Sequence, residues 1–527
     1  MTTSKTCTAI STGRLLPLLA TAATVLAASP ASAAAPGITG PTFNLTAQPA
    51  YITQPDGRMI YSWGYGCDGA PSGYAPSAIS GAFCNSMQVP GPTLIVHEGE
   101  TVTINLRNGL PLPAGSTSIL FPGFTLTSTC PAGQRGLLTC EALPGGTVTY
   151  TFVASSPGTR AYYSGTQGDL QIEMGLYGAI VVLPATIPTE CSSGLHAANL
   201  AAEAHWGESD FRLAAAAYDH AKTCYDREYL FQFSEIDPNI HLQADAQVAA
   251  CGTTPGCTLS VATEPYHPAY FMVNGRSMPD NMDPNYAQQY PHQPYNGNPH
   301  MHPGELTLLR VLGTGRWQHP FHEHGNHVRI LARDGNLILS STTPGDQNLA
   351  GPLLFTTTTT PGLAMDGVFY WTGKGLNWDP YGHNPASSDP LAKLPCTPDA
   401  NGYNTADPTA VNYFEWCQDH DKPLEAKPFG DVAGNGPATL PDPNLFANGP
   451  WYGGSPYLGP DATTRAVGST PIPPFGTVAN SPTGEAGFAF MWHSHNEREI
   501  TTNNIFPGGM LMMMLVDSRE FVIDESL

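Results

Sequence analysis

Two His-x-His pairs are the residues in this chain best suited to chemistry. His322 and His324 lie in HPFHEHGNH, and His493 and His495 lie in MWHSHNERE. Successive residues of a β-strand point to opposite faces, so each pair would present two imidazoles on one side. Two neighbouring strands would then bring four ring nitrogens to one ion or ion pair. The spacing predicts a multi-histidine transition-metal site, and the alternative is a hydrogen-bonded polar core.

A second group of polar residues is out of phase with these pairs. His319 and Ser494 would face the opposite side of their strands, towards a pocket that could include Glu499 and Met510. His319 is expected either to hydrogen-bond Glu499 or to bind an ion. A carboxylate could complete a harder site, so a mononuclear His/Glu site stays open as an alternative.

The two histidine segments resemble the third and fourth copper motifs of the multicopper oxidases, the family of laccases, copper-resistance oxidases and bilirubin oxidases. The first motif is intact as HPFHEHG, whereas the second reads HSHNEREITTNNIFPGGM. Ser494 stands where the family has the cysteine of its mononuclear copper, Glu499 replaces that copper's second histidine, and the methionine is displaced to Met510. A serine hydroxyl does not supply the thiolate that makes such a copper blue.

The amino-terminal half resembles the same family and also lacks its ligands. VPGPTLIVHEGETVTINLRNGLP is similar to the entry of the first cupredoxin domain, but Leu120 and Pro122 stand where the family has HWHG. Tyr163 and Gly165 stand where it has HSH. Four of the family's eight cluster histidines are thus absent at matching positions, so a standard three-copper centre is not expected. Tyr163, Asp169 and Glu173 are expected either to line the same cavity or to fill the vacated volume.

The expected fold class is all-β, with repeated cupredoxin-like Greek-key β-sandwich domains. Alternating segments such as LIVHEGETVTINL and ELTLLRVLG, cut by Gly and Pro, favour antiparallel sandwiches. The alanine-rich stretch 197–225 predicts a helical connector. By resemblance, the domains are a first cupredoxin-like domain at 40–185, a connector at 186–225, a degenerate middle domain at 226–300, and a third domain at 301–520 with a loop insertion at 379–480.

The amino terminus and the cysteines predict export. Residues 1–35 hold Lys5 and Arg14, an apolar run and a small-residue cleavage region, which is typical of a secretory signal peptide. Its removal leaves ten cysteines, an even number suited to an oxidising periplasmic or extracellular compartment. Sequence spacing suggests local bridges, although connectivity stays open: Cys67–Cys84, Cys130–Cys140, Cys191–Cys224, Cys251–Cys257 and Cys396–Cys417. No later stretch is apolar enough to span a bilayer.

The charge excludes some partners. The formal net charge of −22 falls to about −24 once Lys5 and Arg14 are removed, which disfavours nucleic acid and anionic membranes and favours solubility. No phosphate-binding Gly-rich loop or hydrolase elbow is present in the sequence.

Two further motifs have a structural and a functional interpretation. MLMMML (510–515) is typical of a core-filling terminal strand, with a copper–methionine role as the alternative. His300 and His302 form a third His-x-His in a Pro-rich lead-in. We expect an exposed loop pair there, with a peripheral metal contact as the alternative.

Together, the residues and the resemblance predict a secreted copper oxidoreductase with a histidine-only site at His322, His324, His493 and His495. Its expected partners are a small phenolic or inorganic reductant and dioxygen, which would bind on the side left vacant by the missing histidines. Without the cysteine, a reductant must reach the histidine site itself. No catalytic residue beyond the metal ligands is assigned. The competing hypothesis is a non-catalytic copper-sequestering or scaffold protein on the same fold.

Overall fold

The computed structural model describes most of the chain between residues 35 and 525. The described residues are 35–77, 84, 87–343, 345–374, 397–410, 412–416, 418, 454–458, 486–517, 519 and 521–525. The expected signal peptide and most of the expected insertion at 379–480 therefore lie outside the described residues. No helix in the described part of the chain is long and apolar enough to cross a membrane.

The first structural unit is a sandwich of two sheets. Alternate residues of its strands point inward: in TVTINLRN, Val102, Ile104 and Leu106 are fully buried between more exposed neighbours. These side chains meet those of the facing sheet in one apolar core. One sheet has the order β4(Tyr74–Ala75), β1(Gly37–Thr39), β5(Leu94–His97), β9(Tyr177–Leu183), β8(Gly158–Tyr163), and the other β3(Met59–Cys67), β2(Thr42–Thr53), β6(Thr101–Asn108), β7(Thr147–Val153).

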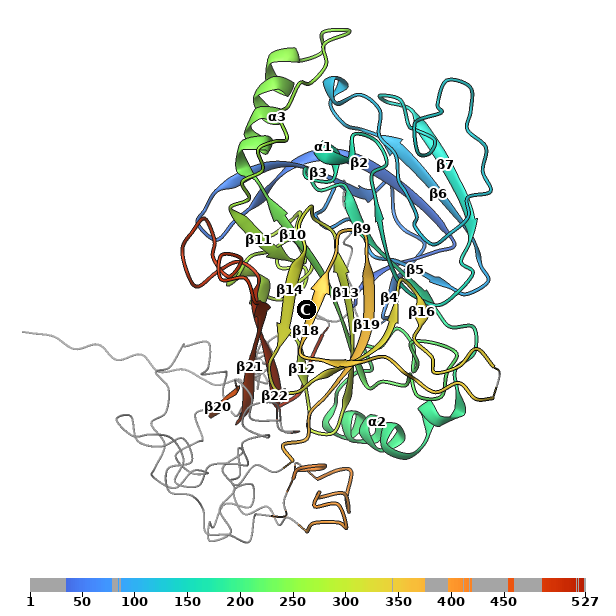
Figure 1. Cartoon of the computed structure of the whole chain (residues 1–527), viewed down its shortest axis with the longest axis vertical. Helices are drawn as coiled ribbons and strands as arrows, with labels where there is room; N and C mark the ends of the chain where they lie inside the picture. Colours follow the sequence, from blue (N-terminus) through green and yellow to red (C-terminus); the bar gives the residue numbers. More distant parts are fainter. Residues whose placement is uncertain are drawn as a thin grey trace, which may run out of the picture.

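The second structural unit is a larger sandwich of two sheets, drawn in green to red in Figure 1. The first sheet has the order β11(Tyr270–Val273), β10(Arg227–Ile236), β13(Leu306–Gly313), β19(Ala364–Tyr370), β15(Val328–Arg333), β16(Asn336–Leu337), with β17(Leu353–Leu354) paired to β15. The second has the order β12(His300–Met301), β22(Leu511–Asp517), β21(Ala486–Ser494), β14(His319–Glu323), β18(Thr356–Thr359), with β20(Gly454–Leu458) paired to β21. The predicted class of cupredoxin-like β-sandwiches is thus confirmed.

The second unit corrects the expected middle domain at 226–300. β10 pairs in parallel with β13 from Arg227↔Thr307 to Phe233↔Gly313, and β11 pairs with β10. These strands therefore belong to a sheet of the third domain. They could not have formed a separate sandwich of their own, because two strands leave an apolar face uncovered.

The core of the second unit is rich in aromatic and methionine side chains. Phe321, Trp492 and Met512 are fully buried in it, together with Phe231 and Phe369 from the facing sheet. Met510, Met512 and Met514 all contribute to this core. Their position agrees with the core-filling interpretation of MLMMML, because alternate residues along this segment point inward.

The helices differ from the expected connector. α2(Gly194–Trp206) ends at Gly207, whose φ of +87° terminates the helix in a left-handed C-cap. The expected helical stretch 197–225 was therefore too long, and residues 207–225 follow as irregular chain with a bridge between Ala216 and Cys224. α3(Pro238–Cys251) was not predicted. Short helical turns complete the described elements: α1(Gly168–Gln171), and 3-10 turns at Leu112–Ala114, Thr189–Ser192 and Asp280–Met282.

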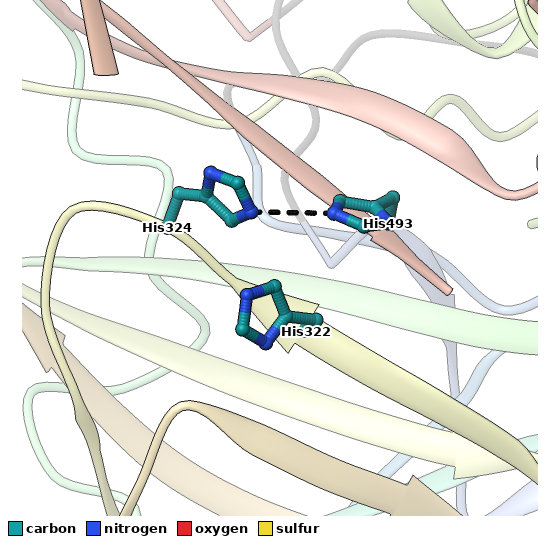
Figure 2. A group of neighbouring side chains, drawn as sticks. All are labelled: His322, His324 and His493. Atoms are coloured by element: carbon teal, nitrogen blue, oxygen red, sulfur yellow. Dashed lines mark hydrogen bonds between the residues drawn. The ribbon is translucent and has the colours of Figure 1, made fainter. Parts of the chain in front are cut away.

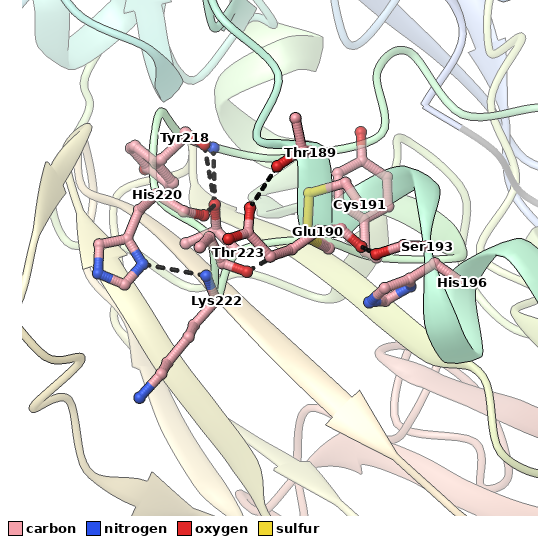
Figure 3. The surroundings of a disulfide bond; sticks show 12 residues. Thr189, Glu190, Cys191, Ser193, His196, Tyr218, His220, Lys222 and Thr223 are labelled. Carbon is pink, nitrogen blue, oxygen red and sulfur yellow. Dashed lines mark hydrogen bonds between the residues drawn. A yellow bond between two sulfur atoms is a disulfide. The ribbon is translucent and has the colours of Figure 1, made fainter.

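Four of the five expected disulfides are formed. Cys67–Cys84, Cys130–Cys140, Cys191–Cys224 and Cys251–Cys257 are bonded as the sequence spacing suggested. Figure 3 shows the Cys191 bridge, which ties the segment before α2 to the chain that leads into β10. The fifth pair, Cys396–Cys417, lies outside the described residues.

Candidate metal centre

One histidine of each pair lies on a strand, His322 on β14 and His493 on β21, and their partners His324 and His495 follow directly after the ends of these strands. β14 and β21 lie side by side and pair antiparallel (Figure 1). In this pairing His322 is directly opposite His493. Phe321 and Trp492, one residue away on each strand, point into the core of the second unit. Because successive side chains alternate, His322 and His493 face the other side of the sheet, away from that core. The two segments are therefore neighbouring strands, as expected, although only His322 and His493 lie within them.

Three of the imidazoles form a compact group. Donor atoms of His322, His324 and His493 all lie within 4.8 Å of one another. Figure 2 shows the rings of His324 and His493 pointing toward each other, with 3.2 Å between their Nε2 atoms. Two nitrogens bound to one tetrahedral ion at about 2.0–2.1 Å would lie about 3.3–3.4 Å apart. The observed separation fits two ligands of one transition-metal ion.

His495 lies at the edge of this group. Its ring centroid is 4.8 Å from that of His322 and 5.5 Å from that of His493. His322 and His493 are buried, whereas His324 is half-buried and His495 is exposed. Among the described residues, the group therefore runs from buried positions to an exposed one.

Hydrogen bonds fix the orientation of two of the rings. Nδ1 of His493 lies 2.7 Å from the carbonyl oxygen of Ser494, which can only accept, so Nδ1 carries the proton and donates. Nε2 of His493 in the neutral ring then keeps its lone pair. Nδ1 of His322 lies 2.6 Å from the hydroxyl of Thr356. Metal-binding histidines commonly make such a bond through the nitrogen that does not bind the metal.

The electrostatics of the group favour neutral rings. Burial and the neighbouring imidazoles lower the pKa of His322 to about 4. Burial also lowers the pKa of His493, and the nearby His495 acts in the same direction. Neutral imidazole is the form that binds a metal, so these two side chains are ready to bind one at neutral pH.

The second pocket holds a buried ion pair. His319 has its Nδ1 2.8 Å from Glu499 and its Nε2 2.9 Å from Glu235, and all three side chains are almost fully buried. Burial lowers the pKa of His319, but the hydrogen bonds to Glu235 and Glu499 outweigh this effect and raise the pKa to about 9. His319 is therefore an imidazolium at neutral pH. Both ring nitrogens of His319 donate hydrogen bonds to carboxylates, which agrees with the expectation that His319 hydrogen-bonds Glu499 and not with the expectation that it binds an ion.

The other residues of the second pocket support the same ion pair. The Ser494 hydroxyl donates to Glu499, and the Asn496 amide donates to the other carboxylate oxygen of Glu499 over 2.8 Å. Met510 is fully buried and packs in the apolar core of the second unit. Glu235 was not predicted as part of this pocket, because it lies 84 residues before His319 and no local motif marks it.

The positions of the missing motifs pack against each other. Leu120 and Tyr163 form a bridge in which each backbone N–H faces the other's carbonyl. A Cβ added at Gly165 would lie 2.8 Å from the side chain of Leu120. Leu120 thus occupies the space next to Gly165, and a larger side chain there requires it to move.

Two further residues of the second missing motif have protein partners of their own. Asp169 accepts a hydrogen bond from Thr263 over 2.8 Å, and Glu173 accepts one from Tyr266 over 2.7 Å. Burial raises the pKa of Glu173. These contacts agree with the expectation that Asp169 and Glu173 fill the volume left by the missing histidines.

The third His-x-His pair is buried, which corrects the expected exposed loop. His300 pairs with Asp517 over 2.5 Å, and His302 pairs with Glu208 over 2.7 Å. Both histidines are nearly inaccessible to solvent because the parallel pairing of β12 with β22 covers the Pro-rich lead-in. The backbone N–H of His302 also donates to Glu305, whose carboxylate pairs with Arg227, so His302 belongs to a buried polar network.

Comparisons with known proteins match about a fifth of the chain. The family model described as multicopper oxidase matches residues 78–186. Laccase-3 of Botryotinia fuckeliana is 35% identical over 109 residues, which cover 20% of this chain and 23% of that protein. Copper resistance protein A of Pseudomonas syringae pv. tomato is 34% identical over 114 residues, 21% of this chain and 18% of that protein. The matches thus span about a fifth of these relatives.

A solved structure, the blue copper oxidase of Nitrosomonas europaea, aligns with 90% of this chain and 85% of its own at 15% identity and a TM-score of 0.43.

Proposed function

Because the chain belongs to the multicopper oxidase superfamily, we propose that it is a copper-dependent oxidoreductase. The copper would be held by His322, His324 and His493, with His495 as a further ligand on the solvent side. The observation that carries this proposal is the convergence of three imidazoles within 4.8 Å at the ends of the paired strands β14 and β21. Imidazole nitrogens suit copper, and copper bound there would supply one-electron redox chemistry.

The proposed centre differs from a blue copper site. Ser494 offers a hydroxyl and no thiolate, and its hydroxyl is already bonded to Glu499. His319 is held between Glu499 and Glu235 as an imidazolium. A protonated ring has no lone pair for a metal. We therefore propose that the second pocket carries no copper, and that electrons enter only at the histidine group.

Accessible histidines support direct contact with a small substrate. His495 is exposed and His324 is half-buried, while Phe355 packs its ring against His322 at 5.6 Å between centroids. Phe355 is 39% exposed. An aromatic surface beside an open metal position suits a phenolic reductant, although an inorganic reductant fits the same opening. Dioxygen is the proposed electron acceptor.

The roles of the surrounding residues follow from their contacts. The Ser494 carbonyl keeps the His493 Nδ1 proton in place, which leaves Nε2 directed toward His324. The hydroxyl of Thr356 contacts Nδ1 of His322 and so fixes the orientation of that ring. The buried wall formed by β14 and β21 excludes water from the inner side, because Phe321 and Trp492 pack directly behind it.

We further propose that the protein is exported to the periplasm or the extracellular medium. The four disulfides among the described residues support this proposal, since such bonds persist in oxidising compartments. The signal-like segment at residues 1–35 supports the same destination.

Metal analysis combined with oxygen uptake tests the proposed activity. The purified protein, loaded with copper and desalted, should retain copper and consume oxygen when given a phenolic or an inorganic reductant. Bound copper without oxygen uptake on any reductant would instead indicate copper sequestration. Absence of bound copper would leave a scaffold protein and contradict the proposal.

A further inference from the structure

A cavity lies between two segments that the metal centre does not use. Its volume is about 210 Å³, and its walls come from Cys84, Met87 and Gln88 on one side and from the loop 286–294 on the other. Met87, Tyr286, Tyr290, Pro291 and Pro294 make most of the wall, and Gln88 adds an amide. We call this the tyrosine cavity. For comparison, an engineered apolar cavity of about 150 Å³ binds benzene or xenon.

The loop wall of the tyrosine cavity is held rigidly. The guanidinium of Arg276 is fully buried and lies 4.4 Å from the ring centroid of Tyr290. It also donates to the carbonyls of Gln293 and Pro284 over 2.7 and 3.0 Å. The Tyr290 hydroxyl donates to Asp283 over 2.6 Å. These bonds fix the Tyr290 ring and the loop that carries it.

The backbone of this wall is constrained as well. Tyr286 has a φ of +56°, which is uncommon for an aromatic residue, and its N–H donates to Pro294 over 2.6 Å. Its ring meets Tyr295 edge to face at 6.2 Å. The conformation therefore places the Tyr286 side chain at the cavity, and surrounding contacts hold it there.

The opposite wall is anchored to the first sandwich. Gln88 donates its backbone N–H to Tyr65 of β3 over 3.0 Å, and its side-chain amide donates to Pro90 over 3.1 Å. His292 contacts the Met87 carbonyl through its ring Nδ1 over 2.9 Å, and its own carbonyl accepts the N–H of Val89. Both walls are thus preformed, which lowers the entropic cost of binding a ligand.

The chemistry of the walls defines the ligand. None of the described residues that line the tyrosine cavity has an ionised side chain, and burying a charge without a partner is costly. Aromatic rings, proline rings and the Met87 thioether favour a flat apolar group. Gln88 and the exposed Gln288 offer amides to one uncharged polar substituent. We propose that the tyrosine cavity is a binding site for an uncharged monocyclic phenol.

This site is independent of the proposed copper chemistry, because its lining contains no metal-binding histidine. Binding is therefore measured on the metal-free full-length chain by titration calorimetry. The probe is p-cresol, and p-toluate is the comparison ligand of similar shape with a negative charge. We expect saturable binding of one p-cresol per chain, and binding of p-toluate that is weaker by at least about tenfold.

Two variants locate the binding site. Ala287→Phe places a ring in the cavity, and Gln288→Trp blocks it from an exposed wall position without disturbing buried packing. Each should weaken p-cresol binding by at least about tenfold. Gln289→Phe, at an exposed neighbour outside the described lining, should bind p-cresol as the wild type does.

Three results would overturn the proposal. These are the absence of saturable p-cresol binding to the wild type, equal affinity for p-toluate, and unchanged affinity in folded Gln288→Trp. Loss of binding in Gln289→Phe equal to that in Gln288→Trp would place the phenol elsewhere. Copper content and oxygen uptake do not enter any of these outcomes, so failure here is separate from failure of the proposed oxidoreductase.

Discussion

The buried imidazolium of His319 should make stability fall in mildly alkaline solution. Its pKa is about 9 in the folded chain, against about 6.5 in an unfolded chain, and this difference corresponds to about 3 kcal/mol of stabilisation. Because the folded-state pKa is the higher one, this contribution is complete below about pH 6.5 and disappears as the pH rises through about 9. About 2 kcal/mol should remain near pH 7.5 and almost none near pH 10.

Glu499→Gln tests this reasoning because it removes one of the two carboxylates that hold the proton on His319. The variant should lower the pKa of His319, so its alkaline loss of stability should begin at a lower pH. Glu497→Gln is the matched control, since it removes the same charge at an exposed position two residues away. Its unfolding free energy should stay within about 0.5 kcal/mol of the wild type.

The assay is the unfolding midpoint of the metal-free protein between mildly acidic and alkaline pH. A loss of about 2 kcal/mol lowers the melting temperature of a domain of about 150–250 residues by about 4–8 °C. Identical pH profiles for the wild type and Glu499→Gln would refute the assignment of His319 as a buried cation. A free energy of unfolding that falls only towards acidic pH would show that folding lowers the pKa of His319 instead of raising it.

Three other predictions follow from single features. The copper-loaded protein should be nearly colourless, because Ser494 supplies no thiolate for an intense sulfur-to-copper absorption band; a deep blue solution on optical spectroscopy would contradict this. Thr356→Val should weaken copper binding by about tenfold, because it removes the hydroxyl that holds the ring of His322. Thr358→Val, at an exposed position opposite Pro320 and two residues along β18, should leave copper affinity unchanged in the same titration. Replacing both Cys191 and Cys224 by serine should lower the unfolding free energy by about 3–4 kcal/mol, because the bridge closes a sequence separation of 33 residues; denaturant unfolding that matches the wild type would argue against a stabilising bridge.

Strand parity predicted which face of its strand each histidine takes, although His324 and His495 lie just beyond the ends of β14 and β21. His322 and His324 share a face in any strand, and the same holds for His493 and His495. The register that puts His322 opposite His493 could not be read from either segment. Glu235 was missed for a related reason: it reaches His319 only through the packing of β10 against the strand pair.

The errors of prediction also have identifiable causes. α3 was missed although Asp237 caps it through the N–H of Asn239 and Pro238 occupies its first turn. The expected helix at 197–225 was extended past Gly207 because the alanines of the later segment have high helix propensity, yet tertiary contacts override it there. His300 was expected in an exposed loop because Asp517, its partner, lies 217 residues away.

Copper content of one double variant tests the central claim most directly. Replacing His322 and His493 by alanine removes one imidazole from each of the two paired strands. After copper loading and desalting, mass spectrometry should find that this variant has lost most of its metal, while circular dichroism shows the fold retained. His319→Ala is the control and should keep copper, because its nitrogens bind carboxylates in the second pocket. Full copper in the double variant, with loss in His319→Ala, would contradict the account and place the metal in the second pocket.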